Sequence, residues 1–126
     1  MTRVIIIDDN REATEMLCEY LVISEMQVLA CGYNGKDAVE LYKKYNPDVI
    51  LVDLAMPEFD GYYAIENIKK INPDAKIIVL TRSVHEYAGK KLAEHKPYAI
   101  FIKPYMIKEL VTMIETCSST PEPITV

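Results

Sequence analysis

The feature that most constrains the fold is the alternation of short apolar runs with amphipathic stretches. Five runs rich in Val, Ile and Leu each precede a stretch whose apolar residues recur at helical spacing. The runs are continuous rather than alternating, which is typical of strands covered on both faces. The expected strands are 3–7, 27–31, 49–52, 76–80 and 99–102, and the expected helices are 11–21, 36–45, 62–71, 84–94 and one beginning near 107. This pattern predicts an open parallel sheet with helices on both faces.

The sequence therefore predicts an α/β fold in three layers, α/β/α. We expect the flavodoxin-like, doubly wound arrangement, with a five-stranded parallel sheet in the order 2-1-3-4-5 and five helices. At 126 residues the chain suits one domain with a substantial core. We assign residues 1–119 to this domain. Residues 120–126 contain two prolines and are expected to form a tail or the start of a linker.

Composition excludes several classes of function. The net charge of −5, from 19 acidic and 14 basic residues, argues against direct nucleic-acid binding by this segment. No apolar run approaches the roughly 18 residues that would span a membrane, and no signal-peptide pattern follows Met1. The three cysteines lack CxxC spacing, so we expect free thiols in the cytoplasm rather than disulfides or a zinc site.

Polar residues follow four of the five expected strands. Asp8 and Asp9 end the first, Asp53 ends the third, Thr81 the fourth and Lys103 the fifth. In open parallel sheets, ligands bind outside the carboxyl ends of the strands, where the strand order reverses. A single acid after a strand is commonly a solvated loop residue or a helix cap. The joint arrangement of all five residues at one edge instead favours a functional site.

Three neighbouring carboxylates raise one another's pKa unless a cation neutralises them. Oxygen ligands of this kind suit Mg²⁺, with Mn²⁺ as an alternative. A metal site of this type points to phosphoryl transfer, in which one carboxylate is the nucleophile and forms an acyl phosphate. The Lys ammonium and the Thr hydroxyl would then bind phosphoryl oxygens together with the metal.

These residues resemble the CheY-like receiver domains of two-component response regulators. The segments VIIIDDN, ILVDLAMPEFDG, IIVLTRS and IFIKPY occur in that family's order and spacing, over roughly residues 3 to 117. The resemblance implies that Asp53 is the phosphoacceptor. It also implies that Asp9, Asp53 and the backbone carbonyl of Ala55 ligate Mg²⁺, while Asp8 acts mostly through bound water.

The resemblance assigns roles to the ends of the last two strands as well. Thr81 would take a phosphoryl oxygen and report phosphorylation by moving inward. Lys103 would pair with the acyl phosphate, and the bond between Lys103 and Pro104 is expected to be cis.

The chain departs from the family at several modulating positions. Ile100 stands where relatives carry a switch aromatic, and alternation along the strand directs the neighbouring Phe101 to the opposite face. Arg82 replaces a small residue and either shields the phosphoryl group or extends into solvent. Ala55 and Ser83 stand where relatives hold the hydrolytic water, so the sequence predicts slow loss of the phosphoryl group.

The leading hypothesis is a signalling phosphoacceptor rather than an enzyme. Its expected partners are a histidine kinase or histidine phosphotransfer protein, a downstream target or its own output domain, and a second copy after phosphorylation. One alternative is the N-terminal receiver of a longer DNA-binding transcriptional regulator. An Asp-nucleophile phosphatase would want a second acid at Ala55, and a flavin binder would want a Ser/Thr/Gly loop where Asp8 and Asp9 stand.

Overall fold

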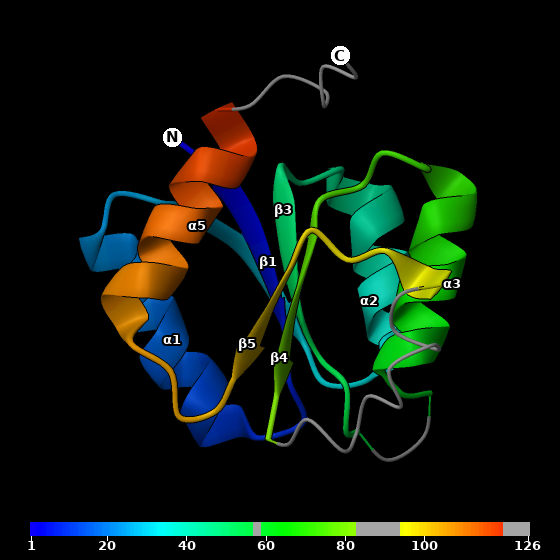
Figure 1. Cartoon of the computed structure of the whole chain (residues 1–126), viewed down its shortest axis with the longest axis horizontal. Helices are drawn as coiled ribbons and strands as arrows, with labels where there is room; N and C mark the ends of the chain where they lie inside the picture. Colours follow the sequence, from blue (N-terminus) through cyan, green and yellow to red (C-terminus); the bar gives the residue numbers. More distant parts are fainter. Residues whose placement is uncertain (57–58, 83–93, 120–126) are drawn as a thin grey trace.

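The five expected strands form one parallel sheet. The computed structural model describes residues 1–56, 59–82 and 94–119. The strands are β1 (Arg3–Ile7), β2 (Gln27–Gly32), β3 (Val49–Asp53), β4 (Ile77–Thr81) and β5 (Ala99–Ile102). They lie in the order β2-β1-β3-β4-β5 (Figure 1), which confirms the predicted topology.

Four helices cover the sheet within the described residues. They are α1 (Arg11–Ile23), α2 (Gly35–Tyr45), α3 (Gly61–Ile71) and α5 (Ile107–Ser119). The fifth helix, predicted at 84–94, falls almost wholly on residues 83–93, outside the described part of the chain. Its last residue, Glu94, is helical together with His95. None of these described helices is long and apolar enough to cross a membrane.

The sheet separates two apolar clusters, because neighbouring residues of a strand face opposite sides. In β1, Ile5 and Ile7 pack toward α2 and α3, whereas Val4 and Ile6 pack toward α1 and α5. Figure 1 shows these two pairs of helices on opposite faces of the sheet. These four residues of β1 are all fully buried. Their burial on both faces explains why the strand sequence does not alternate between apolar and polar residues.

Three polar residues at the carboxyl edge are helix caps. The side chains of Asn10, Asn34 and Asp60 accept backbone N–H groups in the first turns of α1, α2 and α3. Such caps contribute about 1 kcal/mol each. The caps of these three helices are therefore residues other than the acids that end β1 and β3.

A close backbone contact joins the turn after β2 to the loop before α3. The Gly35 N–H donates to the carbonyl oxygen of Phe59 at 2.5 Å. A Cβ atom on Gly35 would lie 2.4 Å from that same oxygen. Only glycine fits this position without movement of the loop, so the loop's end is held against the start of α2.

The described ends of the chain meet at the opposite edge of the sheet. A hydrogen bond of 3.0 Å joins the hydroxyls of Thr2, before β1, and Ser118, in the last turn of α5. Both the N-terminus and the end of α5 lie at the same end of the molecule in Figure 1. The carboxyl ends of the strands, with the candidate site, lie at the other.

Candidate functional site

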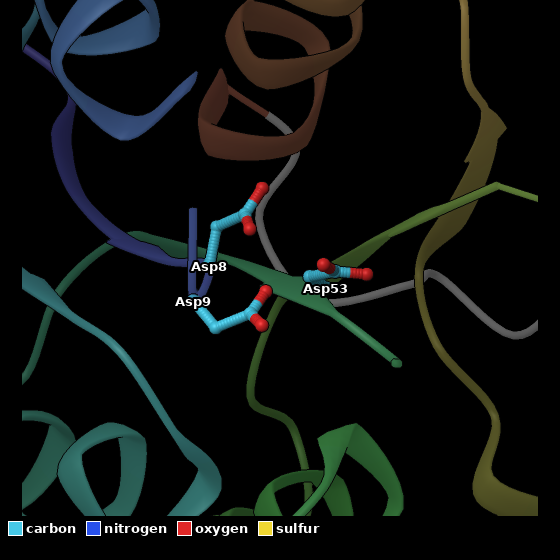
Figure 2. A group of neighbouring side chains, drawn as sticks. All are labelled: Asp8, Asp9 and Asp53. Atoms are coloured by element: carbon cyan, nitrogen blue, oxygen red, sulfur yellow. The ribbon is translucent and has the colours of Figure 1, made fainter. Parts of the chain in front are cut away.

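Three carboxylates meet at the carboxyl edge of the sheet. Asp8 and Asp9 follow β1, and Asp53 is the last residue of β3. Because β1 and β3 are paired, with Ile7 opposite Val52, these acids are brought side by side. Their candidate ligand oxygens all lie within 4.8 Å of one another. Figure 2 shows the three side chains close together, Asp8 and Asp9 next to each other and Asp53 beside them.

Burial and hydrogen bonding distinguish the three acids. Asp53 is 0% exposed and Asp8 is 4% exposed, whereas Asp9 is open to solvent. Both oxygens of Asp8 have partners, since Oδ1 accepts the Asn10 N–H at 3.0 Å and Oδ2 accepts the Lys103 ammonium at 2.9 Å. In Asp53, Oδ1 accepts the Ala55 N–H at 3.3 Å. The other oxygen, Oδ2, is buried and accepts no hydrogen bond from the described residues.

The cation of the site lies closer to Asp8 than to Asp53. Lys103 directly follows β5, and its Nζ is 3.8 Å from Asp53 Oδ2, against 2.9 Å from Asp8 Oδ2. Its backbone N–H donates to the carbonyl of Thr81, the fully buried last residue of β4. The bond between Lys103 and Pro104 is cis, as expected. Thr81 and Lys103 are therefore neighbours at the acidic edge.

The environment of Asp53 disfavours its ionised form. Burial raises its pKa from 3.8 to about 6; the nearby Lys103 ammonium works against this rise, while the negative charge of Asp8 adds to it. Burying a carboxylate whose oxygen lacks a donor is costly unless another cation approaches it. Asp53 thus combines a raised pKa with an unpartnered oxygen, both of which a bound cation would relieve.

The donor set fits a hard divalent cation. Lys103 is the cation paired with the acids in the described part of the chain, so the cluster keeps an excess of negative charge. Among the described residues, none donates a hydrogen bond to Asp9 or to Asp53 Oδ2, and Ala55 is exposed beside them. Oxygen ligands in this number suit Mg²⁺, which retains several waters.

Comparison with known proteins identifies the family. Residues 4–115 match the response regulator receiver domain. The chain belongs to that family. The transcriptional regulatory protein DegU of Brevibacillus brevis is 41% identical over 85 residues, which is 67% of this chain and 35% of DegU. The chemotaxis protein CheY of Bacillus subtilis is 40% identical over 77 residues, 61% of this chain and 64% of CheY. This receiver domain therefore matches less than two thirds of the length of either relative.

Solved structures support the same assignment. A DNA-binding response regulator of the LuxR family from Staphylococcus aureus matches with a TM-score of 0.85 and 27% identity. The alignment covers 94% of this receiver domain and 100% of that chain. Receiver domains are signalling phosphoacceptors, typically bind Mg²⁺, and interact with histidine kinases and with output or target domains.

The modulating positions of this receiver domain are placed as follows. Ile100 is 43% exposed, and Phe101 is half-buried on the opposite face of β5, where its ring lies 5.8 Å from that of Tyr105. The predicted separation of these two residues is thus confirmed. Arg82 is exposed just after β4. Ser83 lies outside the described residues.

One contact between the start of α1 and the residue after β2 has no signature in the sequence. The guanidinium of Arg11, the first residue of α1, stacks over the ring of Tyr33, which follows β2. The position of Arg11, two residues after Asp9, does indicate a positive charge close to the acids. Its partner lies 22 positions further along the chain, so no local pattern indicated the pair.

Proposed function

We propose that this receiver domain is a phosphoacceptor in a two-component phosphorelay and that Asp53 receives the phosphoryl group. The observation that carries this proposal is Asp53 Oδ2, a buried oxygen at a cluster of three acids to which no residue in the described part of the chain donates a hydrogen bond. An unpartnered oxygen is available both to a metal ion and to an incoming phosphorus atom. The approach of Lys103 to 3.8 Å supplies a positive charge beside it.

The residues have complementary roles in the transfer. Asp9, Asp53 and the Ala55 carbonyl would hold Mg²⁺, with Asp8 contributing mostly through water. When bound, this ion supplies positive charge that offsets the repulsion between the acids and an anionic phosphoryl group. Asp53 must be ionised to act as a nucleophile, and its raised pKa of about 6 leaves it mostly ionised at neutral pH.

In the transfer step, an oxygen of Asp53 forms a bond to phosphorus while the bond from phosphorus to the donor breaks. The leaving group, acetate in the case of acetyl phosphate or a histidine nitrogen in a kinase, keeps the electron pair of that bond. The Lys103 ammonium and the Thr81 hydroxyl then bind phosphoryl oxygens. Lys103 needs only to shift from Asp8 toward Asp53 to do so, because it already lies between them.

Phosphorylation that hydroxylamine reverses tests the proposal. Incubation with acetyl phosphate and Mg²⁺ should add one phosphoryl group that hydroxylamine removes, as expected of an acyl phosphate. Asp53→Asn should abolish this labelling. Asp60→Asn is a matched control, because it changes an acid at the same edge to an amide that also caps α3. Undiminished labelling of Asp53→Asn would refute the role of Asp53.

Phosphorylation is proposed to alter partner binding. The donor would be a histidine kinase or histidine phosphotransfer protein in the cytoplasm, where the three free cysteines are expected to stay reduced. The output surface would include β5 and α5, which adjoin Lys103, and a second phosphorylated copy is one partner for it. Backbone resonances of residues 99–118 should shift when beryllofluoride, a phosphoryl mimic, is added with Mg²⁺.

A second candidate function is the receiver part of a longer DNA-binding regulator. The similarity to DegU, a transcriptional regulatory protein of which this chain matches 35%, favours it. In that case the partner would be an attached output domain rather than a separate target. Reading the encoding gene past codon 126 distinguishes the two.

A further inference from the structure

The Arg11–Tyr33 contact joins two strand ends beside the acid cluster. The central carbon of the Arg11 guanidinium lies 3.9 Å from the centre of the Tyr33 ring. Tyr33 is half-buried, and its backbone N–H donates to the carboxylate of Asp37 in the first turn of α2 at 3.0 Å. The backbone that carries the ring is therefore anchored to α2, and the exposed arginine lies over the ring.

Within the described residues, the ring of Tyr33 is the contact that the charge of Arg11 makes. Arg11 is two residues from the exposed Asp9, yet its side chain makes no hydrogen bond or ion pair in the described part of the chain. A cation over a ring contributes about 0.5–1 kcal/mol at an exposed site. A contact with a ring face consumes none of the five N–H donors of a guanidinium, so they stay available to an anion.

The burial of the acids indicates from which side a donor must enter. Asp53 and Asp8 are buried, and Asp9 is exposed. The open side of the site is therefore the side of Asp9, which is also where α1 begins with Arg11. Lys103 is already bound to Asp8 on the inner side, at 2.9 Å. An incoming anion therefore approaches a cluster of carboxylates. The exposed Arg11, two residues after Asp9, is a positive charge on that side that can attract it.

We propose that Arg11, positioned by Tyr33, binds the anionic phosphoryl donor at the entrance of the site. This inference rests on the proposed function and assigns a specificity-determining residue to it. The ligand class is a phosphorylated small molecule or the phosphohistidine of a partner, which share a dianionic phosphoryl group. Planar guanidinium donors match phosphate oxygens in pairs, which a lysine at this position would not do.

The test separates donor binding from transfer. Acetylphosphonate, an analogue of acetyl phosphate that cannot transfer its phosphorus, is titrated in the presence of Mg²⁺ and followed by NMR. Arg11→Gln should weaken its binding roughly 3- to 10-fold, the range expected when one charge at the mouth of a site is removed. At saturating Mg²⁺, the same variant should raise the KM for acetyl phosphate by a similar factor and leave the maximal rate unchanged.

Two further variants control for general effects. Lys43→Gln removes the same charge from the exposed last turn of α2, distant from the edge, and should leave binding unchanged. Tyr33→Leu should reproduce part of the loss, and Tyr33→Phe, which keeps the ring, should lose less. Acetylphosphonate binding by Arg11→Gln equal to that of Lys43→Gln overturns the inference. Absence of labelling in the unaltered protein would instead refute the proposed function, while the acetylphosphonate titration would still decide the role of Arg11.

Discussion

Replacing Asp53 with asparagine should stabilise the Mg²⁺-free protein at pH 7. The Asp53 side chain is 0% exposed, and its Oδ2 has no hydrogen-bond donor among residues 1–56, 59–82 and 94–119. Lys103 is 3.8 Å away and is bound more closely to Asp8. Folding therefore places a negative charge where it is poorly solvated and incompletely paired. Asparagine keeps the shape of the side chain and removes that charge.

The raised pKa of Asp53 sets the size of the effect. The folded protein holds the proton more tightly than the unfolded chain, because the pKa rises from 3.8 to about 6. The free energy of unfolding consequently falls as the pH rises from about 4 to 6, and stays lower above that. At about 1.4 kcal/mol for each pH unit, the total is about 3 kcal/mol at pH 7. In a domain of this length the melting temperature of the variant should rise by roughly 10 °C.

Thermal and urea denaturation in EDTA measure this gain. Glu40→Gln serves as a control, because Glu40 is exposed on α2 and the change alters the net charge equally. The advantage of Asp53→Asn should be small by pH 4 and vanish as the pH falls below 3.8, where Asp53 is protonated in both folded and unfolded chains. Saturating Mg²⁺ should also narrow the gap, since it stabilises only the protein with Asp53. A gain no larger than that of Glu40→Gln, or one that is equal at pH 4 and pH 7, would refute the reasoning.

Further predictions concern the metal, the backbone and the lifetime of the phosphoryl group. Asp9→Asn should weaken Mg²⁺ binding more than Asp8→Asn, because the oxygens of Asp8 are already bonded within the protein; calorimetric titration measures both, and equal losses would contradict this order. Gly61→Ala should lower the free energy of unfolding by about 1–3 kcal/mol, because its Cβ would lie 2.7 Å from the Asp53 carbonyl; urea denaturation that shows no loss would exclude the clash. The phosphoryl group should persist for hours rather than seconds at neutral pH with Mg²⁺, since neither Ala55 nor Ser83 carries a long polar side chain to hold water. Measured phosphate release should be faster in the Ala55→Asn, Ser83→Glu double variant, and a half-life of seconds in the unaltered protein would contradict the idea.

The sheet was predictable from sequence because its strands are continuous apolar runs. The strand at 3–7 is as expected, and the others differ by one residue at most. Helices α2 and α3 begin one residue earlier than predicted, because Gly35 and Gly61 look like turn residues yet occupy the first helical positions after a cap. A glycine at the start of a helix is recognised only when the space around it is known.

The convergence of the acids was also predictable, since strand order alone brings the ends of β1 and β3 together. The closer pairing of Lys103 with Asp8 than with Asp53 was not predictable. It depends on a difference of about 1 Å between the distances from Lys103 Nζ to the Oδ2 atoms of the two acids. The stack of Arg11 on Tyr33 was missed for a related reason. It joins residues from different loops, whose spacing follows no helical or strand period.

The hydrogen bond between Thr2 and Ser118 places both residues at the edge of the sheet opposite the candidate site. A segment joined to either of these residues would start at the edge opposite Asp53, separated from it by the five-residue length of β1, roughly 17 Å at about 3.3 Å per residue. No single side chain bridges such a span. A change at Asp53 would have to reach that edge as a displacement of a whole packed element. Helix α5 is the element that runs from the neighbourhood of Lys103 to Ser118. The stiffness of α5, more than the chemistry of the acids, would then limit how strongly an attached domain is affected by a change at Asp53.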